Sequence, residues 1–143
     1  MELTSDENFT LITENDRLGL YVNIATGNFS VLDKQSHHSW YACPPKIEDG
    51  ILRSFSDSLK SLLNITYSYE GNQMVTVGTY DDEGAMKCRM FKITDGIKLL
   101  FAYDRDGVTF SIPLIIKLQK DYFHCEVDYS AVVEGDRVQI TQL

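Results

Sequence analysis

The 143 residues are enough for one domain with a single core, and 43% apolar with 24% charged residues is typical of a globular domain rather than a disordered one. Thirteen Lys and Arg against twenty-one Asp and Glu give a formal net charge of -8, and the basic residues are scattered along the sequence. Such a chain repels phosphate backbones and anionic headgroups, so we expect neither nucleic acid nor a membrane surface as a partner.

The first predicted strand covers residues 9–13. Residues 18–33 predict a hairpin, because apolar and polar residues alternate on both sides of a turn at 25–28. The stretch 37–50 contains two prolines and has no period, so it is predicted as a loop. Helical turns are expected only within 51–60, where apolar residues recur at spacings of three and four: Ile51, Leu52, Phe55 and Leu59.

Period two then returns and continues to the end of the chain. Pro113 interrupts a long apolar strand and cannot donate to a neighbour, so we place it at a sheet edge or a bulge. Nine or ten short strands, separated by turns rich in Gly and Asp, predict an all-β antiparallel sandwich or barrel with at most one or two short helical turns. The later strands are predicted at 62–69, 74–77, 86–93, 97–103, 108–118, 122–129 and 137–143.

The last predicted strand is still alternating at the final residue, with apolar Val138, Ile140 and Leu143. We therefore expect the single domain 1–143 to be part of a longer multidomain chain cut near Leu143. The run 114–116 lacks polar alternation, which is typical of a strand covered on both faces. Apolar surface left open at the C-terminal strands predicts self-association there.

No metal, cofactor or catalytic group is expected. Cys43, Cys88 and Cys125 have wide spacings that match neither a disulfide framework nor a zinc motif, so we expect three reduced and mostly buried thiols. His37 and His38 lie near Cys43 without a second ligand pair, and the acidic turns 81–83 and 104–107 lack the full calcium-loop pattern. His124 and Cys125 are strand neighbours that point to opposite faces. The isolated chain is therefore not expected to be an enzyme.

The residues that we single out for ligand binding are Trp40, Tyr41 and His38. A Trp ring that lies flat on an exposed loop can stack against the apolar face of a sugar. The alternative is that Trp40 plugs the end of the sandwich. The polar and acidic N-terminal residues are unlike a signal peptide, which favours the cytoplasm over export.

The order of several of these patterns resembles the opening of a family of uncharacterised bacterial multidomain proteins that look like glycoside hydrolases. The resemblance covers most of residues 10–143, and the Gln35-Ser36-His37-His38 segment departs from the family's Thr-Gly turn. In that family an N-terminal galactose-mutarotase-like β-supersandwich precedes a (β/α)₈ barrel. The matching pieces are residues 20–34, Trp40 with Pro44-Pro45, 61–67, 96–103 and 110–114.

The resemblance implies a non-catalytic accessory domain that buttresses the catalytic barrel of its parent chain and contributes to glycan binding. Its partners would then be a carbohydrate and the downstream catalytic domain, and no catalytic residue of the family falls within this chain. Two alternatives remain open: a free-standing carbohydrate-binding module, and a structural β-domain that mediates protein contacts.

Overall fold

The computed structural model describes residues 9–44, 53–81 and 83–143, and these are almost entirely antiparallel β-structure. Strands account for 59% and helix for 6%, so the predicted all-β class is confirmed. The helical parts of the described chain are α1 (Arg53–Lys60) and the 3₁₀ turn η1 (Tyr129–Ala131). Helix α1 falls within the stretch where helical turns were expected.

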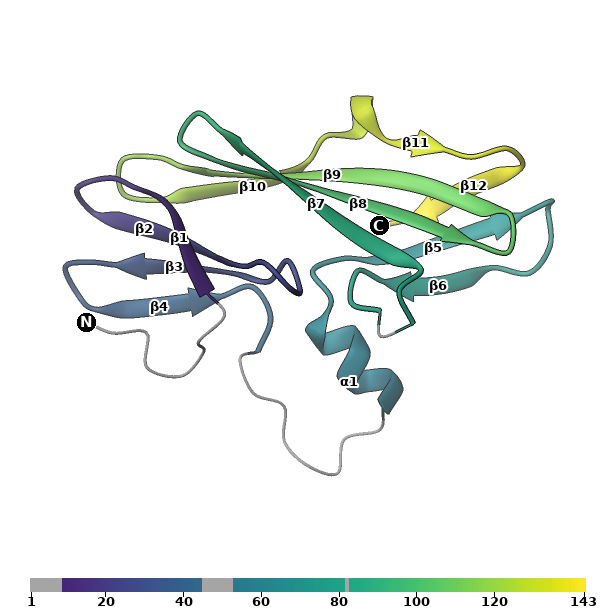
Figure 1. Cartoon of the computed structure of the whole chain (residues 1–143), viewed down its shortest axis with the longest axis horizontal. Helices are drawn as coiled ribbons and strands as arrows, with labels where there is room; N and C mark the ends of the chain where they lie inside the picture. Colours follow the sequence, from purple (N-terminus) through teal and green to yellow (C-terminus); the bar gives the residue numbers. More distant parts are fainter. Residues whose placement is uncertain (1–8, 45–52, 82) are drawn as a thin grey trace.

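The strands form three sheets, of which one spans the whole length of the molecule (Figure 1). Its spatial order is β10-β9-β8-β7, and β11 pairs with β9 beyond the end of β10. The longest strands, β8 and β9, pair over ten consecutive residues. The members are β7 (Met86–Ile93), β8 (Gly96–Arg105), β9 (Val108–Leu118), β10 (Phe123–Val127) and β11 (Val133–Glu134).

Two smaller sheets lie side by side against one face of this long sheet (Figure 1). The first has the order β1-β2-β3-β4 and the second the order β12-β5-β6. The strands of the first are β1 (Phe9–Glu14), β2 (Leu18–Asn23), β3 (Phe29–Asp33) and β4 (His38–Tyr41). Those of the second are β5 (Asn64–Tyr69), β6 (Val75–Gly78) and β12 (Val138–Gln142).

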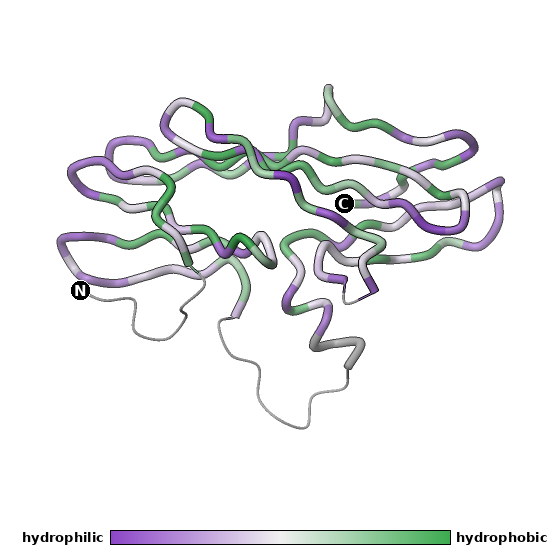
Figure 2. Tube along the Cα trace, in the orientation of Figure 1, coloured by the Kyte–Doolittle hydropathy of each residue, from purple (hydrophilic) through white to green (hydrophobic). Residues whose placement is uncertain are grey.

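The core lies between the long sheet and the two small ones. Phe29 of β3 meets Phe123 of β10 with ring centroids 6.1 Å apart, and Tyr67 of β5 lies 6.0 Å from Tyr103 and 5.6 Å from Phe110. Burying one such side chain contributes about 1.5–3 kcal/mol. Figure 2 shows the hydrophobic stretches within the strands and the hydrophilic ones at the turns. The long sheet contributes Ile97, Leu99, Phe101, Tyr103, Phe110, Ile112, Leu114 and Ile116.

Strand β4 corrects the prediction of a loop from residue 37 onward. Its four residues pair with β3, with Trp40 opposite Val31 and His38 opposite Asp33. The strand has only four residues, which is too short to give a periodic signal. Residues 45–50 of the predicted loop lie outside the described residues.

Pro113 lies neither at an edge nor at a bulge of its own strand, because β9 runs between β8 and β10. The β10 pairing ends at Val127 opposite Leu114, and the amide of Asp128 then donates to the carbonyl of Pro113 at 3.1 Å. A residue's N and C=O point to the same side of a strand, so the proline nitrogen faces the interruption between β10 and β11. The missing N–H therefore costs no ladder bond.

The structure corrects part of what the sequence predicts for the closing strands, namely that the run 114–116 is covered on both faces and that apolar surface stays open at 138–143. Leu114 and Ile116 are buried, but Ile115 is half-buried on the opposite face, so the run 114–116 is not covered equally on both sides. Val138 is buried, and Ile140 packs against the core. The exposed apolar side chains near the C-terminus are instead Tyr129 and Val133.

Candidate functional site

The three residues singled out from the sequence all lie on β4, which is an edge strand of its sheet. His38 and Trp40 are two residues apart and share one face, where their rings meet edge to face with centroids 5.0 Å apart. Tyr41 points to the other face, and its ring contacts Phe9 at 5.7 Å. The structure therefore brings His38 and Trp40 together and separates Tyr41 from them.

Trp40 is neither a buried plug nor a ring lying free on a loop. It pairs with buried Val31 on the face of the sheet that carries the core, and it remains 45% exposed because β4 is the edge strand. Trp40 lines neither of the two cavities described below. The predicted trio thus forms a partly exposed aromatic edge that lines none of the cavities formed by the described residues.

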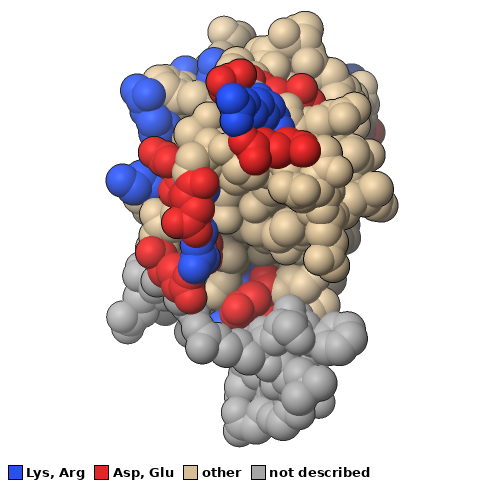
Figure 3. Space-filling view, turned by 90° about the vertical axis from the view of Figure 1, so that its right-hand side faces the viewer, with Lys and Arg blue, Asp and Glu red and all other residues tan. Residues whose placement is uncertain are grey.

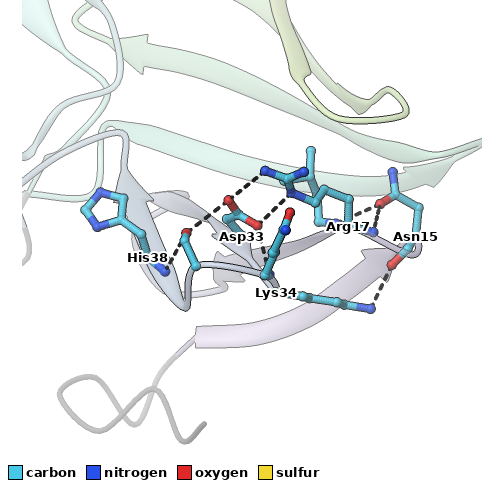
Figure 4. Close-up of polar contacts among 8 residues, drawn as sticks. Asn15, Arg17, Asp33, Lys34 and His38 are labelled. Atoms are coloured by element: carbon cyan, nitrogen blue, oxygen red, sulfur yellow. Dashed lines mark hydrogen bonds and ion pairs between the residues drawn. The ribbon is translucent and has the colours of Figure 1, made fainter.

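The turn before β4 is held by the buried carboxylate of Asp33 (Figure 4). It accepts hydrogen bonds from Arg17 Nε at 2.8 Å, from the amide of Gln35 at 2.9 Å and from the hydroxyl of Ser36 at 3.0 Å. The hydrogen bond from Arg17 holds the pKa of Asp33 well below its ordinary value. Because these contacts occupy the carboxylate, and the His38 ring points away from the cluster, Asp33 has a structural role.

A cavity of about 470 Å³ lies elsewhere, between the C-terminal part of α1, strands β5 and β6, and the end of β8. We call it the α1–β6 pocket. Its lining mixes aromatic rings, hydroxyls, an amide, carboxylates and a guanidinium, and such mixed linings orient small polar ligands. The side chains that matter for its chemistry are Ser58, Asn64, Tyr80, Asp81, Tyr103 and Arg105.

The wall of the α1–β6 pocket is fixed by close contact between α1 and β6. The Ser61 hydroxyl donates to the carbonyl of Asp57 at 2.9 Å and accepts from the amide of Tyr80 at 3.0 Å. A side chain at Gly78 would place its Cβ 2.1 Å from Ser61 Oγ, so this approach requires glycine. Lys60 Nζ lies 4.9 Å from the centroid of the Tyr80 ring and holds that ring by a cation–π contact.

The charged groups of the pocket are already paired within the fold. Burial alone would raise the pKa of Asp81, but hydrogen bonds from the backbone amides of Glu83, Met86 and Ala85 outweigh it and lower that pKa. Arg105 Nη1 pairs with Glu83 at 2.6 Å, and the charge of Glu83 raises the pKa of the guanidinium.

Tyr103 supplies a neutral hydroxyl to the pocket. Burial, followed by a hydrogen bond with Tyr67, raises the pKa of Tyr103 to about 12. The phenol therefore stays protonated at neutral pH and can both donate and accept hydrogen bonds.

Sequence reasoning missed this pocket, because its residues come from α1, β5, β6, the segment after β6 and β8. The one local signal is the acidic turn 81–83, which lacks the full calcium-loop pattern and is typical of a solvated hairpin tip. The structure describes Asp81 and Glu83 of that turn, and both are engaged with protein groups. No cluster of three or more His, Cys, Asp or Glu side chains that could hold a metal occurs within the described residues.

The cysteines do not form a reactive centre with His124. His124 Nε2 lies 3.0 Å from Glu126 Oε2, and both residues lie on the face of β10 opposite to Cys125. Burial raises the pKa of Cys43 and of Cys88 to about 11, and burial followed by the charge of Glu126 raises the pKa of Cys125. Cys125 is nevertheless exposed on its edge strand, which corrects the expectation of mostly buried thiols for this residue.

None of the helices that the structure describes is both long enough and apolar enough to cross a membrane. No protein-family model, no curated protein and no solved structure matches the chain.

Proposed function

We propose that this chain is a non-catalytic β-sandwich accessory domain of a carbohydrate-active multidomain protein, and that it contributes to glycan binding through the α1–β6 pocket. The observation that carries the proposal is the lining of that pocket. It combines the ring of Tyr80, the neutral phenol of Tyr103, the amide of Asn64 and the guanidinium of Arg105 around about 470 Å³.

This combination suits a sugar. Its hydroxyls both donate and accept hydrogen bonds, so they require neighbouring donors and acceptors, while its C–H faces pack on aromatic rings. The volume lies within the range of about 300–1,000 Å³ that is usual for small-ligand sites. The pocket also opens at the surface, which gives a longer glycan room to extend.

The same lining favours binding over hydrolysis. A glycosidase needs two carboxyl groups about 5–10 Å apart, one of them with a raised pKa so that it can donate a proton. Asp57 and Asp81 both line the pocket, but the pKa of Asp81 is lowered and its carboxylate accepts backbone amides. Asp81 therefore lacks the property of a general acid.

The test is a titration of the isotope-labelled chain with a panel of soluble oligosaccharides, followed by amide chemical shifts. We expect one or more oligosaccharides to shift the amides around Asn64, Tyr80 and Arg105. Tyr80→Ala and Asn64→Ala should each weaken binding at least about tenfold, since each removes contacts worth over 1 kcal/mol.

Trp40→Ala is the control, because it removes a partly exposed aromatic ring outside the pocket. If Trp40→Ala abolished binding while Tyr80→Ala did not, the glycan site would lie on β4 instead. If no member of the panel shifted any resonance, the glycan-binding part of the proposal would be wrong.

A second candidate function is an interaction domain that self-associates, and a specific groove favours it. A cavity of about 760 Å³ lies between β11 and β12. Its lining is mostly apolar, with Val132 and Ile140 among its members, and also includes Glu134, Thr141 and Gln142. Tyr129 and Val133 border it and are 73% and 59% exposed. Sedimentation at increasing protein concentration tests this function.

A further inference from the structure

The long sheet has a second face, which neither small sheet covers. The side chains of β8 and β9 that do not enter the core point to it, and the register places Arg89 opposite Leu100, Phe91 opposite Lys98, and Lys98 opposite Ile115. Lys87 and Lys117 flank this group along β7 and β9. We call this surface the basic face; it consists of Lys87, Arg89, Phe91, Lys98, Leu100, Ile115 and Lys117.

Two of the four cations of the basic face, Arg89 and Lys98, are held in place without being neutralised. The ring of Phe91, 38% exposed, lies 5.4 Å from the guanidinium of Arg89 and 5.2 Å from the ammonium of Lys98. Among the described residues, none of the four cations forms an ion pair with a carboxylate. Cation–π contacts orient a charge but leave it positive, so these groups can still bind an anion.

The sheet gathers cations that are scattered in the sequence, because antiparallel pairing places β7, β8 and β9 side by side. β7 and β9 contain no acidic residue, and the acids lie in the turns. Asp95 and Asp121 bound one end of the face, Asp104 and Asp106 bound the other, and Glu126 on β10 borders its side. Figure 3, which views the molecule from one end, shows acidic and basic side chains next to each other on that end.

Protection of an edge strand does not explain the whole basic face. Lysine on an edge strand blocks pairing with another chain, and this accounts for Lys87 and Arg89 on β7. Lys98 and Lys117 lie on β8 and β9, which are interior strands with both edges already paired. A different role is needed for these two cations.

We propose that the basic face docks an acidic polypeptide segment that also carries apolar side chains. The cations supply partners for carboxylates, while Phe91 and the half-buried Leu100 and Ile115 supply apolar contact between them. Lys87 lies opposite Ala102 of β8, and Lys117 lies opposite Gly96 of the same strand. Along the strand direction the face therefore extends over six residues, which is about 20 Å and matches an extended segment of about the same length. This proposal is independent of glycan binding at the α1–β6 pocket.

The charge distribution argues against a long polyanion or a lipid surface as the occupant. A nucleic acid strand or an anionic bilayer would extend past about 20 Å and meet the acidic turns at both ends of the face. The net charge of -8 repels any anion at long range, and this repulsion increases with the number of negative charges that the occupant carries. A short acidic segment can instead end within the face.

The experiment uses the full chain, isotope-labelled, and a seven-residue capped peptide of alternating Glu and Leu as the probe. We expect the peptide to shift the amides of β7, β8 and β9 selectively and to bind more weakly as salt is raised. The same peptide with Gln in place of Glu should bind at least about fivefold more weakly, since it loses several charge pairs. Twelve-nucleotide oligothymidylate and phosphatidylserine vesicles are the competing probes.

The matched variants remove two charges each. Lys87→Gln with Arg89→Gln should weaken peptide binding about tenfold, because two contacts to the probe are lost. Lys120→Gln with Arg137→Gln removes the same charge from turns outside the face and should change binding less than twofold. All variants are expected to keep the β-type circular dichroism spectrum, since the substituted side chains are exposed.

Three results would overturn the proposal. One is the absence of shifts on β7–β9 at millimolar peptide. Another is equal binding of the Glu and Gln peptides, which would make the contact purely apolar. The third is tighter binding of oligothymidylate or of the vesicles at the same amides, which would identify a nucleic acid or a membrane as the occupant.

Discussion

The side-chain amide of Asn15 donates a hydrogen bond of 2.6 Å to the backbone carbonyl of Gln119 and so joins the two layers of the sandwich at one end. The Asn15 Oδ1 atom accepts the amides of Arg17 at 2.9 Å and Leu18 at 2.7 Å. Lys34 Nζ donates to the Asn15 carbonyl at 2.7 Å. One residue therefore holds the β1–β2 turn, the β3–β4 turn and the β9–β10 turn together.

Replacement of Asn15 should destabilise the fold. Asn15→Ala removes three side-chain hydrogen bonds and leaves the partly buried amide of Leu18 unpaired, so we expect the free energy of unfolding to fall by about 1–3 kcal/mol. Urea denaturation measures the change. Asp16→Ala, on the same turn, is the control and should have little effect; equal losses for the two variants would contradict the role assigned to Asn15.

The pair formed by Asp33 and Arg17 should make stability depend on acid pH. The folded state lowers the pKa of Asp33, so the stabilisation is present above the unfolded pKa of about 3.9 and is lost as the pH falls from there toward the folded pKa. We expect the unfolding free energy of Asp33→Asn to depend less on pH below about pH 4 than that of the unsubstituted chain. Asp136→Asn, on the exposed β11–β12 turn, is the control, and matching pH profiles for both variants would count against the pair.

Gly96 allows close approach between β8 and β9. A Cβ at this position would lie 1.9 Å from the carbonyl oxygen of Ile116, which is backbone and cannot rotate away. Gly96→Ala should therefore lower the unfolding free energy by at least about 1–3 kcal/mol, as overpacking does. At Gly19 the nearest atom belongs to the flexible ring of Tyr21 at 3.1 Å, so Gly19→Ala should cost less. The reverse order in thermal unfolding would show that the β8–β9 spacing is not limiting.

The three thiols should differ in reactivity with a disulfide reagent. Cys125 is exposed, Cys88 is half-buried and Cys43 is buried, and all three are free in the structure. We expect one thiol to react quickly in the native protein and three in denaturant, since access and thiolate fraction both control the rate. Cys125→Ser should remove the fast phase. A native fast phase that survives this substitution would mean that β10 does not expose its cysteine.

The strands that could be predicted from the sequence are those whose period was long enough to be unambiguous. β7 and β9 begin and end where the alternation and the turns placed them, at residues 86–93 and 108–118. β4 has four residues and β11 has two, so both strands are too short to carry a period that can be recognised. Their positions depend on pairing with β3 and β9, which is tertiary information.

The candidate sites were harder to predict for the same reason. Trp40 is the only Trp and can therefore be singled out from the sequence. Tyr80 and Tyr103 line a pocket that no local sequence motif predicts. Arg89 and Lys98 are nine residues apart in sequence and meet only through the ring of Phe91. Strand register, and not local composition, creates both the α1–β6 pocket and the basic face.

The apolar groove between β11 and β12 should mediate self-association. Tyr129 and Val133 are its exposed apolar members, and exposed apolar surface on a monomer favours contact with a second copy. We expect sedimentation velocity to show a species larger than the monomer whose fraction rises with protein concentration. Val133→Lys should reduce that fraction, because a charge buried in an apolar contact is costly.

Gln35→Lys introduces the same charge on the exposed β3–β4 turn and serves as the control. Since Val133 is mostly solvent-exposed in the single chain, Val133→Lys should leave the thermal unfolding midpoint close to that of the unsubstituted protein. Ile140→Lys should both dissociate and destabilise the protein, because Ile140 packs against the core as well as lining the groove. A chain that sediments as a monomer at every concentration, with or without Val133→Lys, would show that this groove does not bind a second copy.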